Sequence, residues 1–210
     1  MDEAYKSIVR HYEACLAKHG DSHLGVDWPN TYDAMKRYLV MEEIVKFCTT
    51  KRESYTLLDF GCGAGHFLEY LKGRKVNHFH YSGCDLSDRF IALCNAKFPG
   101  TPFFQVDALK TPEKIGQYDI ILMNGVFTEK RELSFDQMWG YFKQLVSLLF
   151  HKSSVGIALN VMSKHVDWER DDLFHLSHDL LVGYLVKNLT RNFVIRNDYG
   201  LYEYTVYIYR

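Results

Sequence analysis

The sequence lacks the features that mark secreted and membrane-spanning proteins. Its five cysteines include no CxxC pair and follow no regular spacing: Cys15, Cys48, Cys62, Cys84 and Cys94. It shows no signal peptide and no apolar run of transmembrane length. We therefore expect five reduced thiols in a cytoplasmic protein that makes no contact with a membrane.

Strong net charge, internal repeats and low-complexity tracts are also missing. The chain has 25 Lys and Arg against 26 Asp and Glu, a net charge of −1, so no overall attraction to nucleic acid is expected. No stretch is rich enough in Pro, Gly or Ser to act as a linker. We therefore expect residues 1–210 to form one domain, in which 1–52 are a helical cap and 55–210 an α/β core.

The most informative stretch is 55–67, which reads YTLLDFGCGAGHF. A short apolar run predicts a buried strand, and the apolar spacing that follows 65 predicts a helix. Between them lie Gly61, Gly63 and Gly65, which permit positive φ and let a ligand approach the backbone. A strand, a glycine loop and a helix N-terminus together indicate a site for an anionic or strongly polar ligand.

From 55 onward, strand and helix patterns alternate, which predicts a mostly parallel sheet with helices on both faces. Ser87 is expected to cap one helix, and Ser134 with Gln137 to form a capping box at the start of another. The expected strands are Tyr55–Gly61, His80–Leu86, Pro102–Ala108, Tyr118–Gly125, Ser154–Met162, Phe193–Asn197 and Glu203–Tyr209.

The final two strands break this alternation. Only Asp198, Tyr199, Gly200 and a few flanking residues separate them. A parallel crossover needs a dozen residues or more, so we expect an antiparallel hairpin here.

Two amphipathic helices precede the first strand. The first spans Asp2 to Lys18, and the second follows Pro29 and Asn30. The first carries an apolar stripe of Tyr5, Ile8, Val9, Tyr12 and Leu16. Two placements remain open: the helices cap one side of the sheet, or they lie over the mouth of the ligand site.

Taken together, the strand order, the glycine loop and the acids that end the second and third strands resemble the class I S-adenosylmethionine-dependent methyltransferases. The resemblance covers roughly Tyr55 to Arg210. The family's first motif, an acidic residue followed by x-G-x-G-x-G, reads here as DFGCGAG from Asp59 to Gly65. The whole chain also resembles a set of bacterial methyltransferase-like proteins. The resemblance implies a Rossmann-like, doubly wound sheet of seven strands, with the antiparallel seventh between the fifth and sixth.

This resemblance implies a cofactor, S-adenosyl-L-methionine, with S-adenosyl-L-homocysteine as the product. Backbone N–H groups of the loop would meet the methionine carboxylate, Asp85 the ribose hydroxyls, and Asp107 the adenine amino group. A basic residue of the preceding helix, Arg37, would also bind the carboxylate. The expected cofactor-binding residues are Arg37, Asp59, Gly61, Cys62, Gly63, Gly65, Asp85, Leu86, Asp107, Ala108, Asn124 and Gly125.

Several of these assignments have a plain structural alternative. Asp85 and Asp107 could be solvent-facing ends of strands, and Arg37 a solvated surface residue. Asp59 would either contact the amino group of the cofactor or only brace the loop by accepting its N–H groups.

The substrate side is less defined. Trp28, Phe127 and Trp168 are candidate substrate contacts, and an indole in a loop could close over a sulfonium by a cation–π contact. Core packing is the alternative for the tryptophans. His165, His175 and Glu203 are candidate proton acceptors. No HExxH motif or cysteine partner is present, so no metal site is expected.

Three functions remain to be compared. A nicotinamide-dependent oxidoreductase would need glycine at 66 to complete G-x-G-x-x-G, and the chain has His66 there. A protein that binds the cofactor without transferring its methyl group is a second alternative. Asn124-Gly125-Val126-Phe127 stands where base methyltransferases carry N/D-PP-Y/F, which makes nucleic acid an improbable partner. We therefore expect methyl transfer to an oxygen or nitrogen of a small molecule.

Overall fold

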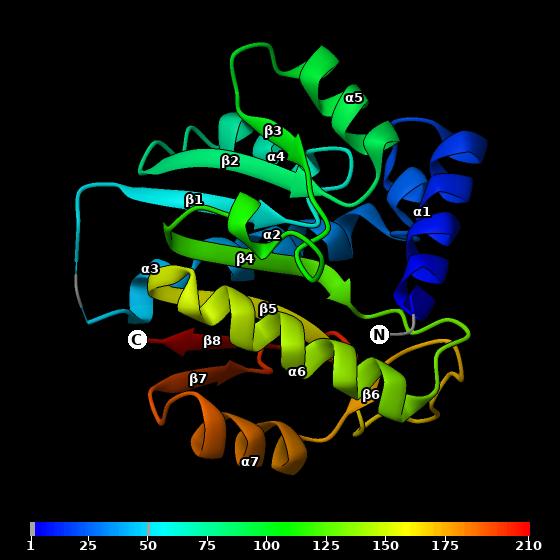
Figure 1. The fold of residues 1–210 in the computed structure, drawn as a ribbon, viewed down its shortest axis with the longest axis vertical. Helices are drawn as coiled ribbons and strands as arrows, with labels where there is room; N and C mark the ends of the chain where they lie inside the picture. The colour runs from blue at the N-terminus through cyan, green and yellow to red at the C-terminus, as the bar shows by residue number, and fades with distance from the viewer. Residues whose placement is uncertain (1–2, 50) are drawn as a thin grey trace.

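A computed structural model describes residues 3–49 and 51–210 as an α/β structure with one central sheet (Figure 1). Asp2, where the first helix was predicted to begin, lies outside the described residues. The strands are β1 (Tyr55–Phe60), β2 (Phe79–Asp85), β3 (Phe103–Gln105), β4 (Tyr118–Phe127), β5 (Ser153–Ser163), β6 (His175–Leu176), β7 (Phe193–Arg196) and β8 (Glu203–Tyr209). The α-helices are α1 (Lys6–His19), α2 (Thr31–Glu42), α3 (Ile44–Phe47), α4 (His66–Gly73), α5 (Asp88–Lys97), α6 (Phe135–His151) and α7 (His178–Asn188), and the 3-10 helices are η1 (Glu3–Tyr5), η2 (His23–Val26) and η3 (Pro112–Lys114).

The strand order is β3-β2-β1-β4-β5-β8-β7, so the chain reverses its winding direction between β1 and β4. Strands β1 to β5 pair in parallel, whereas β8 is antiparallel to both β5 and β7. The predicted doubly wound sheet and its C-terminal hairpin are therefore confirmed. The two-residue strand β6, which pairs in parallel with the end of β5, was not predicted because it is too short to show a pattern.

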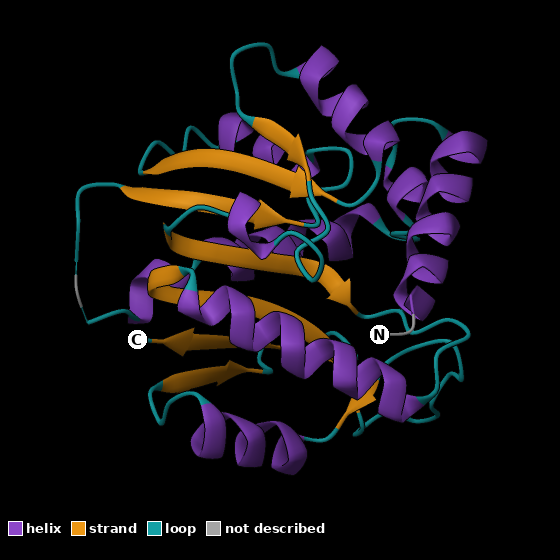
Figure 2. Ribbon diagram, in the orientation of Figure 1, coloured by secondary structure: helices purple, strands orange, loops and turns teal. Residues whose placement is uncertain are grey.

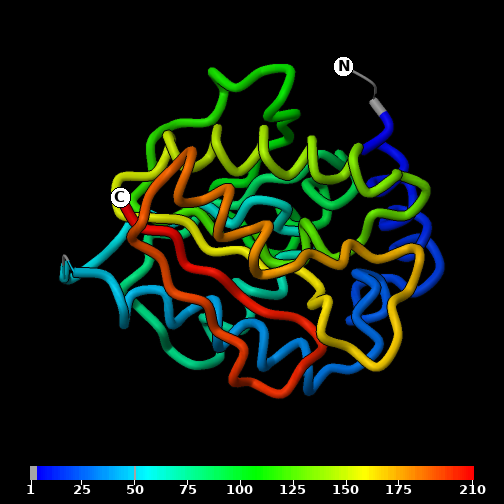
Figure 3. Tube along the Cα trace, turned by 90° about the horizontal axis from the view of Figure 1, so that it is seen from below, coloured from blue at the N-terminus to red at the C-terminus, as the bar shows by residue number. Residues whose placement is uncertain are grey.

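Helices cover both faces of the sheet in three layers (Figure 2). Helices α6 and α7 lie on one face, and α2 and α3 on the other, as the view from below shows (Figure 3). Because side chains alternate along a strand, β4 serves both layers. Ile121 and Met123 pack with α6, while Ile120 and Leu122 pack with α2 and α4. All four are fully buried, as expected of a central strand.

Side-chain caps fix where the helices begin. Ser87 accepts a hydrogen bond from the N–H of Phe90 at the start of α5. Ser134 and Gln137 form the reciprocal capping box of α6. Both were predicted from the sequence. The third strand is shorter than predicted, because the chain leaves the sheet after Gln105 and turns toward η3.

Helix α1 stands across the carboxyl ends of β1, β2 and β4 (Figure 1). Of the two placements left open for the first helix, the structure has the one over the mouth of the site. Among the described residues, no helix combines the length and the apolar character needed to cross a bilayer.

Candidate cofactor and substrate site

A deep cleft opens at the point where the strand order reverses, which is where ligands bind in open α/β sheets. Its open space is about 950 Å³, including the mouth. The walls come from the glycine loop, the ends of β2 and β4, and helices α1, α2 and α6. The lining residues are Tyr5, Ile8, Val9, Tyr12, Val26, Trp28, Tyr38, Asp59, Gly61, Cys62, Gly63, Ala64, His66, Phe67, Asp85, Leu86, Ser87, Phe90, Asn124, Gly125, Val126 and Tyr141.

The glycine loop passes close to the floor of this cleft. Gly61 and Gly63 have φ of 75° and 51°, a region that side chains disfavour. A Cβ on Gly61 would lie 2.7 Å from Cγ2 of Val126. Gly65 also has positive φ, and it lies at the N-terminus of α4, packed against Phe98 rather than in the cleft lining. The glycines therefore let a ligand approach the backbone closely, but their N–H groups already donate within the protein, to the carbonyls of Cys84 and Cys62 and to the carboxylate of Asp85.

Asp59, at the end of β1, is a buried carboxyl group in the cleft wall. Burial raises its pKa to about 7; the hydroxyl of Tyr81, which donates at 2.7 Å, opposes this rise, and the charge of Asp85 adds to it. A carboxyl poised near neutrality becomes a strong acceptor once a cation lies beside it. Among the described residues, the loop N–H groups donate to acceptors other than Asp59, so it does not brace the loop in that way.

Asp85, at the end of β2, joins the loop to the next helix. Its Oδ2 accepts from the N–H of Gly63 at 3.0 Å, and its Oδ1 from the N–H of Ser87 at 2.9 Å. Burial raises the pKa of Asp85, and these backbone donors counteract the rise. The solvent-facing alternative does not apply, because the side chain lines the cleft. Each oxygen keeps a lone pair for a further donor.

Asp107 lies in an adjoining smaller cleft, with Leu86, Ala108 and Tyr141. Its Oδ2 accepts from the hydroxyl of Tyr5 at 2.8 Å. The Tyr5 ring stacks on Tyr141, with ring centroids 5.1 Å apart. The aliphatic and aromatic side chains that line this smaller cleft suit an apolar ring system.

Asn124 and Gly125 line the cleft from the last part of β4, where its pairing with β5 shifts register. The Oδ1 atom of Asn124 is buried and has no hydrogen-bond partner among the described residues. Gly125 has φ of 82°, and its N–H donates to Oδ1 of Asn160 at 2.8 Å. The indole of Trp28 packs so closely on Gly125 that a Cβ there would lie 2.9 Å from Cζ2.

Arg37 does not line the cleft, although the sequence suggested it as a cofactor ligand. Its guanidinium pairs with Glu203, at 2.9 Å and 2.8 Å from Nε to the two carboxylate oxygens. It also lies over the Trp28 ring, 4.1 Å from the ring centroid. Arg37 is therefore already engaged, and so is Glu203, one of the candidate proton acceptors.

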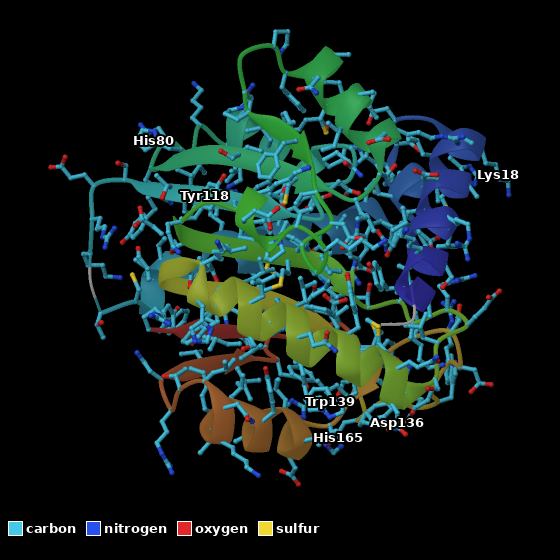
Figure 4. All side chains as sticks on the ribbon, viewed as in Figure 1. Lys18, His80, Tyr118, Asp136, Trp139 and His165 are labelled. Carbon is cyan, nitrogen blue, oxygen red and sulfur yellow. The ribbon has the colours of Figure 1, made fainter. Side chains whose placement is uncertain are left out.

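The other two candidate bases lie outside the cleft lining as well. His175 is buried and satisfied: Nδ1 donates to the carbonyl of Ser163 at 2.6 Å, so Nε2 accepts from the N–H of Arg170 at 3.2 Å. His165 lies at the α7 end of the molecule, away from the glycine loop (Figure 4), and its ring faces His178.

Two of the candidate substrate contacts also lie elsewhere. Trp168 is 72% exposed and lines a separate hollow beside Tyr202. Phe127 is fully buried in the core, in contact with Phe142. Trp28 is the candidate substrate contact that lines the cleft.

The sequence reasoning missed several cleft residues, chiefly aromatic ones: Tyr5, Tyr12, Tyr38 and Tyr141. Tyr5 and Tyr12 belong to the apolar stripe predicted for the first helix, so part of that stripe lines the site, while Ile8 of the same stripe also packs in the core. Burial raises the pKa of both Tyr12 and Tyr38, which keeps these phenols neutral. For Tyr38 and Tyr141, an apolar helical face carried no signal to separate cleft from core.

Three potential metal ligands meet beside the cleft. His11 Nε2 lies 2.7 Å from Oδ2 of Asp27 and 3.7 Å from Sγ of Cys15. The ligand atoms of the three residues all lie within 4.8 Å of one another. The contact between His11 and Asp27 joins α1 to the segment before Trp28. That the protein binds no metal stays a prediction.

The site fits S-adenosylmethionine on the chemistry of its donors and acceptors. The glycines leave the backbone accessible beside the uncapped N-terminus of α4, and the buried Oδ1 of Asn124 lacks a donor that an ammonium group would provide. Asp85 and Asp107 retain acceptor capacity at the ends of neighbouring strands.

Comparisons with known proteins agree with this geometry. Residues 58–150 match the family model described as a methyltransferase domain. A putative methyltransferase of Mycobacterium tuberculosis, Rv1506c, is 24% identical over 159 residues, 74% of this chain and 93% of the relative.

Two solved structures share the fold across the whole chain. Magnesium protoporphyrin IX methyltransferase from Synechocystis, with bound S-adenosylmethionine, is 16% identical with a TM-score of 0.61, covering 100% of this chain and 98% of that one. The plantazolicin methyltransferase BpumL, with S-adenosylhomocysteine, is 15% identical with a TM-score of 0.65, covering 100% and 99%. Together these matches support the chain as a class I S-adenosylmethionine-dependent methyltransferase.

Proposed function

We propose that the protein transfers the methyl group of S-adenosylmethionine to an oxygen or nitrogen atom of a small, largely apolar molecule in the cytoplasm. The observation that carries this is the composition of the cleft. Its walls are mostly apolar and aromatic, with Tyr12, Val26 and Trp28 on the side of the cap. The polar lining side chains are Asp59, His66, Asp85, Ser87 and Asn124. An acceptor with apolar or aromatic surface would be desolvated there.

In this proposal, Asp59 and the free Oδ1 of Asn124 hold the amino group of the cofactor. N–H groups at the N-terminus of α4 bind its carboxylate, Asp85 its ribose and Asp107 its adenine. When bound, the cofactor supplies an electrophilic methyl group and its own leaving group. The residues of this chain then provide alignment and exclusion of water.

The names of the solved neighbours also bear on the class of acceptor. The two solved neighbours are named for magnesium protoporphyrin IX and for plantazolicin, neither of which is a nucleic acid. We also propose that residues 1–210 act as one domain, because the cap and the core share this cleft.

None of the sequence-derived base candidates lines the cleft, so we propose that proximity and alignment carry the transfer. A phenol, which ionises readily, or a neutral amine, which attacks through its lone pair and loses a proton afterwards, needs least help with its proton.

The test is incubation with methyl-labelled S-adenosylmethionine and a panel of apolar phenols and amines, after calorimetric titration with S-adenosylhomocysteine and NAD. We expect binding of the S-adenosyl compound, no binding of NAD, and label in an extractable small product. Label recovered only in nucleic acid or polypeptide would refute the small-molecule proposal.

A further inference from the structure

A chain of buried polar contacts links one wall of the cleft to the other. The N–H of Gly125 donates to Oδ1 of Asn160, and Nδ2 of Asn160 donates to Oε1 of Glu203 at 2.9 Å. Glu203 accepts from Nε and Nη2 of Arg37, the latter at 2.7 Å from Oε2. Arg37 stacks on Trp28, and Trp28 packs on Gly125, which closes the circuit.

This circuit brings together segments that are far apart in the chain. Arg37 is on α2, Gly125 at the end of β4, Asn160 on β5 and Glu203 at the start of β8. Arg37 and Glu203 are 166 residues apart. Their pairing joins the helical cap to the hairpin at the carboxyl ends of the central strands.

The polar members are buried almost completely. Glu203 is 1% exposed and Asn160 is 0% exposed, while the Arg37 side chain is 14% exposed. A buried ion pair is weak evidence for stability, because desolvation offsets much of the attraction. Its better-attested use is to select one geometry, so the question is which geometry this pair selects.

Each end of the circuit fixes a surface of the cleft. Asn160 holds the peptide N–H of Gly125, and so the positive-φ residue that follows Asn124 in the irregular part of β4. Arg37 covers a face of the Trp28 ring, and the edge of that ring meets Gly125 with no space for a methyl group between them. Trp28, Asn124 and Gly125 all line the cleft, whereas Arg37, Asn160 and Glu203 do not.

We propose that Arg37, Glu203 and Asn160 are positioning residues that hold the Trp28 indole against Gly125 and so set the wall of the cleft beyond the glycine loop. This inference rests on the proposed function, since that wall is where the proposed acceptor meets the cofactor. It replaces two roles suggested by the sequence: Arg37 as a ligand of the cofactor and Glu203 as a base. In the structure these two side chains pair with each other instead.

Two variants are decisive. Glu203→Gln keeps an acceptor for Asn160 and removes the negative charge. Arg37→Lys keeps the positive charge but removes the planar guanidinium that pairs with Glu203 and stacks on Trp28. The matched control is Glu43→Gln. It breaks another cap-to-hairpin ion pair, Arg196–Glu43 at 2.8 Å, whose side chains are 16% and 15% exposed. Neither Glu43 nor Arg196 lines the cleft.

Two readouts separate positioning from general stability. S-adenosylhomocysteine affinity is measured by calorimetry. The accessibility of Trp28 is measured by acrylamide quenching in a background with Trp139→Phe and Trp168→Phe. We expect both decisive variants to weaken affinity about tenfold and to increase quenching of Trp28, and Glu43→Gln to change neither, even where it lowers the unfolding midpoint.

The double variant Arg37→Met with Glu203→Gln restores charge balance. We expect its unfolding midpoint to recover relative to Glu203→Gln, while affinity and quenching stay altered. Wild-type affinity and quenching in both Glu203→Gln and Arg37→Lys would overturn the positioning role and leave the proposed function intact. Failure of the wild type to bind S-adenosylhomocysteine would refute the proposed function itself.

Discussion

The buried carboxyl of Asp59 predicts an unusual dependence of stability on pH. Its pKa is raised from 3.8 to about 7 in the folded protein, because burial disfavours the charged form. Between these values the folded state keeps a proton that the unfolded chain releases. Stability therefore falls as pH rises through this window and levels off above pH 7. At about 1.36 kcal/mol per pH unit, the full effect is of the order of 4 kcal/mol.

The variant Asp59→Asn removes the titrating group and keeps an acceptor for the Tyr81 hydroxyl. Urea unfolding of the ligand-free protein between pH 5 and 8 measures the difference between variant and wild type. We expect the variant to gain stability relative to the wild type as pH rises, up to a plateau near pH 7. Asp136→Asn, at an exposed site on α6, is the control and should follow the wild-type slope.

Parallel stability curves for wild type and Asp59→Asn across this range would refute the reasoning, since they would mean that Asp59 titrates normally. Cofactor adds a second check. A bound ammonium beside Asp59 would favour its charged form, so S-adenosylhomocysteine should bind more tightly above pH 7 than below it. Asp59→Asn should abolish that difference in a calorimetric titration.

Three further predictions concern the cleft and its surroundings. Gly125→Ala should destabilise the fold by about 1–3 kcal/mol and weaken S-adenosylhomocysteine binding, because φ is 82° and a Cβ would meet Trp28. Thermal unfolding and calorimetry measure the two effects. The control Gly140→Ala, on α6 with open space around it, should neither destabilise the fold nor weaken binding. Asp85→Ala should lower affinity at least tenfold, since hydrogen bonds to a charged group contribute about 1.5–3 kcal/mol, and unchanged calorimetric affinity would exclude its ribose role. His175→Ala should lower stability by about 1–3 kcal/mol by orphaning buried backbone groups, and a loss of affinity without loss of stability would contradict its structural assignment.

The fold was largely accessible from the sequence because its signals are local. Three such signals are the glycine loop, the apolar run of β4 and the short connection before β8. Each of them is made by residues that lie close together in the sequence. Those patterns fix strand type, helix starts and the antiparallel hairpin. What they could not supply is any contact between distant segments.

The candidate site shows which residues local sequence patterns can identify and which they cannot. Asp59, Asp85 and Asn124 were identified because each ends a strand at one edge of a parallel sheet. Arg37 and Glu203 were assigned separate roles, because nothing in either segment indicates that they meet. Aromatic cleft residues such as Tyr38 were missed, because a helical face looks the same whether it covers a core or a ligand.

The position of β8 has a consequence for synthesis of the chain. It pairs between β5 and β7, although 39 residues separate the end of β5 from its start. On a ribosome, at about 5–20 residues per second, β5 therefore emerges with one apolar edge unpaired until β8 follows. Such an edge is a template for association with other chains. Nascent chains stalled within this interval should be the aggregation-prone species, and chaperone binding should peak there.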